Sequence, residues 1–287
     1  MNPCKFGIVL IALALLLMAA GCDRAGQESA TGSVSANEAY LKHFGEPPVP
    51  EQGSCFARVV YFPLADDPAR VRAVPMFLFR ENNQFPVLLD RLLDREWDFP
   101  SHSGLLNPFP PGSAIAVNSQ ADETVTIDLL LPAGAEMDSA AMIAPLVETV
   151  LQFKEVKRVF ITRAGVSLAE IPEDGFRHDP SRIVPAGPPL LLMAAGSWEE
   201  GEEHPQEILI NFDRPVDIGE FRLLDANGRE IEGEYFRSIF DMAVVVHPSE
   251  PQTLHEGMTV RVSWEAVDRL GRTAGGEQSF ILERFDH

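Results

Sequence analysis

The side chains that could do chemistry are scattered along this chain, and their spacings match no catalytic motif. No two of the seven histidines lie three or four residues apart, the spacing that places two zinc ligands on one helix face. The sequence holds no G-x-S-x-G, H-E-x-x-H, P-loop or G-x-G-x-x-G motif. It therefore predicts no enzyme, no cofactor, and no catalytic, cofactor-binding or metal-ligating residue.

Carboxylates are abundant, but they fall in expected turns. Asp66-Asp67 and Asp122-Glu123 are adjacent pairs that water can solvate, whereas a general acid needs a partner and a pocket. Residues 225–230 resemble part of a calcium loop, yet further ligands are missing, and Asn227-Gly228 favours a tight hairpin turn. The acidic run at 199–203 reads as a solvated loop, with cation or partner binding as the alternative. An unrecognised hydrolase would need Asp or Glu and His residues converging in one pocket, which this dispersal disfavours.

Three tryptophans, Trp97, Trp198 and Trp264, would suit stacking on sugar rings if they were exposed. Core or half-buried positions are the favoured interpretation, because these large rings bury well. Glycan binding stays open as an alternative function. An exposed aromatic patch in a groove on either domain would favour it.

The net charge limits the possible partners. The formal charge of the 287-residue chain is -20 at pH 7. Nucleic acid is excluded as a partner, because a polyanion needs a basic footprint. An anionic lipid surface is disfavoured for the same reason, and an acidic surface mainly keeps a protein soluble.

The N-terminus predicts export and lipid attachment. Residues 1–21 combine Lys5 with a fifteen-residue apolar run, which is typical of a signal peptide and short for a transmembrane helix. The run ends in Met18-Ala19-Ala20-Gly21-Cys22, which resembles a lipobox, the cleavage site of bacterial lipoproteins. The resemblance implies that Cys22 carries a lipid on the extracytoplasmic face of the cell membrane. Ala19 stands where that motif usually has leucine.

Residues 22–54 are rich in Gly, Ser, Ala, Glu and Pro. This composition predicts a flexible, lipid-anchored tether, with Tyr40, Leu41 and Phe44 as candidates for local docking. Cys55 is then the only ordinary thiol of the exported protein, so no intramolecular disulfide can form. We expect Cys55 to be buried, with pairing between chains as the alternative.

Residues 55–172 predict one domain with the order β-β-α-β-β-α-β. Strands are expected near 57–64, 73–79, 113–117, 124–131 and 159–161, and helices from Pro86 and from Asp138 or Ser139. Pro75 predicts an edge strand. In the second helix, Leu146, Val147, Val150 and Leu151 form one apolar stripe. We expect a mostly antiparallel sheet with both helices on one face.

The end of this domain carries a family resemblance. Thr149, Gln152-Phe153, Val156, Lys157-Arg158-Val159 and Gly165 occur in an order similar to the end of a GerMN domain. This family is named for sporulation and spore-germination proteins and also occurs in envelope lipoproteins. The resemblance implies a non-catalytic α/β module outside the cytoplasm, and it names no ligand.

Residues 173–188 are rich in Pro, Gly and charged residues and predict a linker. From 189 to 287 the apolar period is two, and short strands are expected near 207–212, 221–224, 243–247, 258–264 and 278–282. The segments 210–217, 254–260 and 267–271 resemble a bacterial Ig-like domain, which implies a β-sandwich that spaces, displays or binds.

Together, these features predict an α+β protein: a GerMN-like domain followed by an Ig-like sandwich. The expected function is that of a lipid-anchored, non-enzymatic envelope protein that contacts other proteins, in sporulation or germination. Binding of peptidoglycan or another glycan is the alternative. The expected partners are the membrane, through the lipid on Cys22, and an envelope protein or peptidoglycan.

Overall fold

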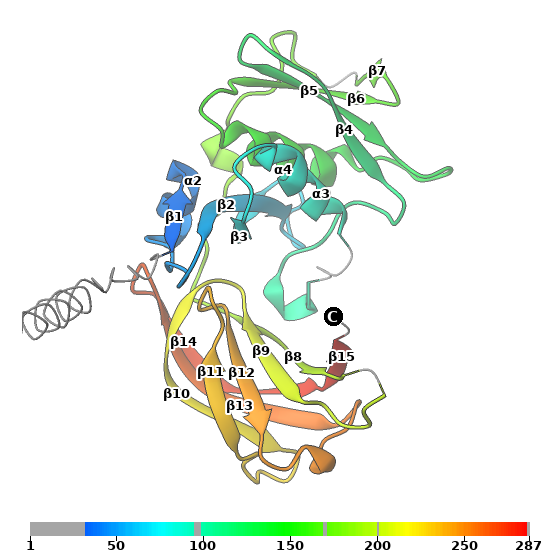
Figure 1. The fold of residues 1–287 in the computed structure, drawn as a ribbon. Helices are drawn as coiled ribbons and strands as arrows, with labels where there is room; N and C mark the ends of the chain where they lie inside the picture. The colour runs from blue at the N-terminus through cyan, green and yellow to red at the C-terminus, as the bar shows by residue number, and fades with distance from the viewer. Residues whose placement is uncertain (1–31, 95–98, 169–170, 200, 286–287) are drawn as a thin grey trace, which may run out of the picture.

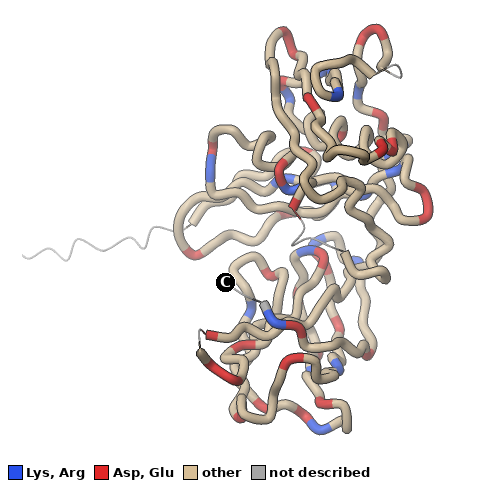
Figure 2. The backbone as a smooth tube through the Cα atoms, turned by 90° about the vertical axis from the view of Figure 1, so that its right-hand side faces the viewer, with Lys and Arg blue, Asp and Glu red and all other residues tan. Residues whose placement is uncertain are grey.

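The computed structural model describes residues 32–94, 99–168, 171–199 and 201–285. The predicted signal peptide, Cys22 and Trp97 lie outside these ranges, so their expected roles stay predictions. In the described ranges, no helix combines the length and the apolarity that crossing a membrane requires. Acidic positions are spread over both domains rather than gathered in one patch (Figure 2).

The first domain has the predicted order of elements. Its elements are β2 (Ser54–Pro63), β3 (Val71–Leu78), α3 (Gln84–Leu93), a 3-10 turn (Ser101–Ser103), β4 (Ala114–Ala121), β5 (Thr124–Leu130), α4 (Ser139–Leu151), β6 (Arg158–Arg163) and β7 (Val166–Ser167). Asp138 caps α4 as expected, because its side chain accepts a hydrogen bond from the Ala141 N–H at 3.2 Å. Pro75 lies on β3, which is an edge strand.

The strands of this domain form two sheets instead of one, and α3 and α4 lie between them (Figure 1). One sheet has the order β1-β2-β3, where β1 is Ser33–Ala36, and the other has the order β4-β5-β6-β7. The reason lies in α4, where every residue from Ala141 to Val150 is buried. A helix that is apolar all round needs cover on more than one side, which a single sheet cannot give.

The expected flexible tether is wrong from Ser33 onward. Strand β1 (Ser33–Ala36) pairs in parallel with β2, and helix α2 (Glu38–Phe44) follows it. Tyr40 and Phe44, four residues apart on α2, are both buried against Ala57 and its neighbours on β2 and β3. This apolar pair anchors an otherwise polar segment, so the stretch packs as part of the first domain.

The second domain is a β-sandwich. Its strands are β8 (Leu191–Ser197), β9 (Glu207–Phe212), β10 (Val216–Asp225), β11 (Gly233–Arg237), β12 (Ala243–Pro248), β13 (Thr259–Asp268), β14 (Thr273–Ile281) and β15 (Glu283–Phe285), with a 3-10 turn at Pro251–Thr253. Another 3-10 turn, Pro180–Arg182, lies in the segment between the domains. The sheets β10-β13-β14 and β11-β12-β9-β8-β15 share one apolar core. This architecture is compatible with the expected Ig-like domain. Strands β8, β11 and β15 were not predicted.

The two domains are fastened at their junction by a buried ionic cluster. The Asp268 carboxylate contacts the Nη1 atom of Arg214 at 3.2 Å and Nε of Arg272 at 2.6 Å. Arg272 also donates to the carbonyl of His43 on α2 and to that of Ala186 in the segment between the domains. One side chain thus ties three parts of the chain together.

Aromatic rings add a second contact across the junction. Phe77 on β3 stacks on Phe240 of the second domain with ring centroids 4.0 Å apart. The expected linker also packs on the first domain, because Phe176 pairs with Val159 and Ile183 with Val71. The two domains are therefore in direct contact and are not separated by a flexible linker.

Candidate functional site

The corner where α2 meets the end of α4 holds two adjoining cavities. The first, of about 410 Å³, is lined by Lys42, Lys154 and Lys157 among others, and we call it the lysine pocket. The second, of about 940 Å³, is lined by six Asn and Gln side chains, and we call it the amide pocket. Both pockets share Glu38, Gln152, Phe153 and Lys154. The two pockets therefore adjoin at these residues, and we refer to them together as the groove.

Every lysine that the structure describes lines the lysine pocket. Lys42 lies in the last turn of α2, whereas Lys154 and Lys157 follow α4. The Nζ atom of Lys154 lies 2.8 Å from Oε1 of Glu38. In the described part of the chain, Lys42 and Lys157 form no ion pair. The three lysines come together because α2, the segment not expected to fold, packs beside the end of α4.

The floor of this pocket carries a carboxylate–imidazole pair. Glu148 is the one charged residue of α4, and its side chain is only 2 % exposed. Its Oε2 atom lies 2.6 Å from Nδ1 of His178, and its Oε1 accepts the Asp179 N–H at 3.0 Å. Burial raises the pKa of Glu148, although these hydrogen bonds oppose the effect. The pair fixes the imidazole ring of His178, which lines the pocket.

A second histidine lies deeper. Nε2 of His43 is 3.4 Å from the Tyr61 hydroxyl, and both side chains are buried. Burial is the main cause that lowers the pKa of His43 to about 4, and the positive charge of Lys42 adds to it. His43 is therefore neutral near pH 7. It contributes a hydrogen-bonding group to the pocket rather than a charge.

These residues correct one part of the sequence reasoning. Glu148, His178 and His43 do converge in one pocket, although acidic and histidine residues were expected to stay dispersed. Sequence spacing could not bring them together, because they come from α2, α4 and the segment after β7. A lone Glu in an otherwise apolar helix was the only available signal. Among the described residues that line the pocket there is no Ser, Thr or Cys, and the one hydroxyl is that of Tyr61, which is buried beside His43.

The amide pocket is built around Gln152. Its Nε2 donates to the carbonyls of Val59 and Thr149, and its Oε1 accepts from Asn37 Nδ2 at 2.9 Å. These bonds hold the start of α2 against the end of α4. The side chains of Asn82, Asn83 and Gln120 also line the pocket and make no hydrogen bond within the described residues. Their donors and acceptors are available to a ligand.

Phenylalanine rings complete the amide pocket. Phe56 and Phe153 line it and are partly exposed, and Phe85 packs edge-on against Phe153 with centroids 5.7 Å apart. The rings can contact the apolar faces of a polar ligand, and the free amides beside them can bond to its hydroxyl groups.

The tryptophans and the cysteine that the sequence analysis considered, as far as the structure describes them, are buried. Trp198 and Trp264 are buried: Arg284 lies over the ring of Trp198, and Trp264 packs edge-on against Phe212. The expected core positions are confirmed for these two tryptophans. Cys55 is buried and free, as expected, and burial raises the pKa of its thiol.

The expected acidic turns are also confirmed. Asp66 and Asp67 are exposed, and Asp122 and Glu123 form the turn between β4 and β5 with φ of 50° and 59°. The Asp225 side chain accepts hydrogen bonds from the N–H groups of Asn227 and Arg229, which closes a tight turn. Within the described ranges, no group of three or more His, Cys, Asp or Glu residues is placed to hold a metal ion.

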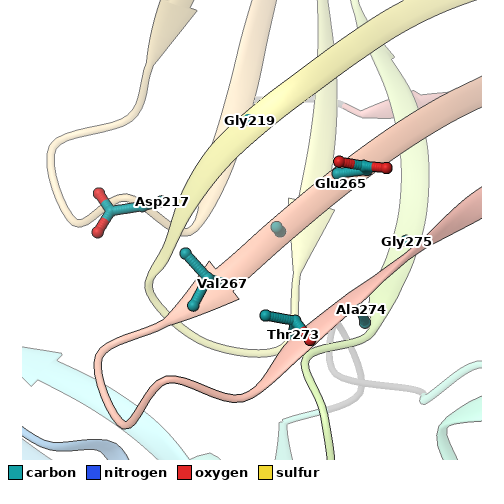
Figure 3. A pocket seen from close by; sticks show the side chains of 8 residues that line it. Asp217, Gly219, Glu265, Val267, Thr273, Ala274 and Gly275 are labelled. Atoms are coloured by element: carbon teal, nitrogen blue, oxygen red, sulfur yellow. The ribbon is translucent and has the colours of Figure 1, made fainter.

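A further cavity, of about 520 Å³, lies against the β10-β13-β14 sheet (Figure 3). Its two carboxylates, Asp217 and Glu265, lie on opposite sides of it (Figure 3). Asp217 is already paired with Arg269 at 2.7 Å and with Arg237 at 3.3 Å. The separated acids provide no site comparable with the groove.

Comparison with known proteins concerns mainly the first domain. Residues 59–169 match the Germane family model, described as sporulation and spore germination. The chain is similar to the first GerMN domain of the sporulation protein GerM from Bacillus subtilis, with 19% identity, 43% of this chain and 93% of that chain covered, and a TM-score of 0.32. The chain is also similar to the tandem GerMN domains of GerM from Bacillus subtilis, with 16% identity, 67% of this chain and 59% of that chain covered, and a TM-score of 0.32.

CopC from Methylosinus trichosporium OB3b is also similar, with 14% identity, 33% of this chain and 88% of that chain covered, and a TM-score of 0.22. Comparison with curated proteins returns no match. The TM-scores of these structural matches are low. The likeness of the first domain to the GerMN family therefore rests on the family model and on the order of its helices and strands. The resemblance seen in the sequence is confirmed: residues 59–169 match the model of the sporulation and spore germination family.

Proposed function

We propose that this chain is a lipid-anchored protein on the extracytoplasmic face of a bacterial cell membrane. It acts without catalysis, by contacting another envelope protein in sporulation or spore germination. The GerMN domain supports the process, and the apolar run that ends at Cys22 supports the anchor. A Cys22→Ala variant is expected to leave the membrane fraction, and intact mass is expected to show lipid only on the unaltered chain.

The observation that carries protein contact is an apolar patch across the domain junction. Phe79 at the end of β3 is 67% exposed, and Ile239 of the second domain is 69% exposed. Phe240 follows Ile239 in the chain, and its ring centroid lies 5.7 Å from that of Phe79. Large exposed apolar side chains that gather at one place mark interaction surfaces more often than single ones do. We call these three residues the junction patch.

The test is genetic and uses the patch directly. In the source organism, a Phe79→Ser/Ile239→Ser variant is expected to reproduce the sporulation or germination defect of a deletion strain, at normal protein level. A matched control, Val166→Ser, changes an equally exposed apolar residue on β7, away from the junction. A deletion strain with normal envelope, sporulation and germination would contradict the proposal.

A second candidate, glycan binding, is favoured by the amide pocket. Unpaired amides beside Phe56 and Phe153 suit a ligand with many hydroxyl groups, although the two described tryptophans are not available. Co-sedimentation of the chain with purified peptidoglycan tests this candidate. Saturable binding that survives moderate salt supports it, and absence of binding leaves protein contact alone.

A further inference from the structure

The lysines of this chain are few, and their placement is specific. The chain has a formal charge of -20, and Lys5 is its only lysine besides the three of the lysine pocket. Lys42 reaches the pocket from a different segment than Lys154 and Lys157. The Asn37–Gln152 hydrogen bond, at 2.9 Å, fixes the two segments beside one another. A folded corner, rather than a mobile tail, brings the positive charges together.

The acidic groups of the pocket leave room for an anion. Both carboxylate oxygens of Glu148 are engaged, one by His178 and the other by the Asp179 N–H, and the side chain is buried. Glu38 pairs with Lys154, but both side chains are highly exposed, and such pairs are weak. Lys42 and Lys157 form no ion pair in the described part of the chain. Their ammonium groups are therefore free to bind an oxyanion.

The adjoining pocket defines the rest of the ligand. Asn82 and Gln120 offer unpaired amides within the same groove, and Phe56 offers a partly exposed ring. These amides match hydroxyl groups. Arg58, which also lines the pocket, already donates to Gln84 and to two carbonyl groups, and the exposed Glu81 and Glu155 of the lining disfavour a second anionic group there. A ligand that spans both pockets therefore has an oxyanion at one end and a hydroxyl-rich body at the other.

We propose that the groove binds an anionic glycopolymer of the envelope, with its carboxylate or phosphate group held by Lys42 and Lys157 and its sugar or polyol body in the amide pocket. This inference rests on the glycan-binding candidate and names the charge and the residues that select the ligand. Muropeptides supply a carboxylate and poly(glycerol phosphate) supplies a phosphate, so either polymer presents the required chemistry.

The experiment measures affinity with three labelled probes against the detergent-extracted, full chain. The probes are muropeptides released from peptidoglycan by a muramidase, oligomers of poly(glycerol phosphate), and a hexaglutamate peptide. Lys42→Gln/Lys157→Gln is expected to weaken glycopolymer binding at least about tenfold, because each charged hydrogen bond contributes substantially. Arg70→Gln/Arg229→Gln removes the same charge from two exposed positions outside the groove and is expected to change affinity less than about twofold.

The outcomes distinguish a carboxylate ligand from a phosphate ligand, and failure of this inference from failure of the glycan-binding candidate. Binding of muropeptides alone identifies a carboxylate ligand, and binding of poly(glycerol phosphate) alone identifies a phosphate ligand. Asn82→Ala/Gln120→Ala, which keeps the lysines, is expected to weaken glycopolymer binding and to leave hexaglutamate binding unchanged. Hexaglutamate bound as tightly as either glycopolymer overturns the inference, as does binding of neither polymer. Muropeptide binding that is insensitive to the lysine variant overturns it while leaving the glycan-binding candidate in place.

Discussion

Replacement of Asp268 at the domain junction is expected to be among the most destabilising single changes in the chain. Its carboxylate is 1% exposed and contacts Arg214 and Arg272, and its Oδ1 accepts the N–H groups of Leu270 and Arg272 at 3.0 Å. Asp268→Ala leaves Arg214, itself 2% exposed, with Asp213 as its remaining ion-pair partner and the Gly187 carbonyl as a hydrogen-bond acceptor. Removing one partner of a buried ion pair costs about 3–5 kcal/mol.

The lower end of that range is expected, because both arginines keep other partners. Arg214 retains two bonds to Asp213, at 3.0 and 2.7 Å, and Arg272 retains two carbonyl groups. We therefore expect a loss of about 3 kcal/mol. With a urea m-value of about 2–3 kcal/mol/M, the midpoint of unfolding falls by about 1–1.5 M.

Asp217→Ala is the matched control in the same urea experiment. Asp217 also pairs with two arginines, Arg269 and Arg237, but its side chain is 43% exposed. Exposed pairs contribute about 0–1 kcal/mol, so its midpoint is expected to move little. If Asp268→Ala shifted the midpoint no more than Asp217→Ala, the reasoning that burial makes the junction cluster important would be refuted.

Three further predictions concern single groups. Burial acts to raise the pKa of Asp268, but hydrogen bonds from Arg272 and the Leu270 N–H outweigh it and lower the pKa; its contribution to stability is therefore complete above about pH 5 and is lost as pH falls below about 4. Urea midpoints measured from pH 7 to pH 3 should converge for the unaltered chain and Asp268→Ala, and parallel curves would contradict this. Tyr40→Phe should raise the free energy of unfolding by about 1 kcal/mol, because the buried Tyr40 hydroxyl has no hydrogen-bond partner among the described residues; a lower melting temperature would argue against it. Glu148→Gln should lower the free energy of unfolding by about 1 kcal/mol or less at pH 7, because burial already raises the pKa of Glu148. Glu148→Leu leaves the Asp179 N–H unpaired and should lower the free energy of unfolding by about 1–3 kcal/mol more. Equal melting temperatures for the two variants would count against this reasoning.

Local signals predicted the framework of both domains. Asp138 before an apolar run indicated the start of α4, and the interruption at Pro75 indicated an edge strand; both are confirmed. Alternation of apolar residues at 207–212 predicted β9 with the bounds that the structure has. Such features depend on residues within one turn or one strand, so a single sequence contains them.

Long-range packing was less accessible. The polar composition around Tyr40 and Phe44 predicted a tether, whereas the burial of these two rings decides that α2 folds onto β2. The stripe on α4 suggested one sheet, because residues such as Ala141 and Ala144 are small and give little signal although both are buried. That α4 is covered on two sides can be inferred only once both sheets are known.

The candidate site could not be predicted at all. Lys42 and Lys157 are ordinary surface lysines in the sequence, and their convergence depends on the packing of α2 beside α4. Glu148 and His178, which are 30 residues apart in the sequence, also meet only through the fold. The part of the family resemblance that lies at residues 149–159 borders this groove, but it named no ligand.

The most direct test of protein contact is site-specific photo-crosslinking in living cells. A photoreactive phenylalanine analogue placed at Phe79 is expected to give one discrete protein adduct during sporulation or germination. The same analogue at Val166, which is comparably exposed on β7, is expected to give none. No protein adduct at Phe79, or equal adducts at both positions, would contradict the account that this envelope protein acts through a partner bound at the domain junction.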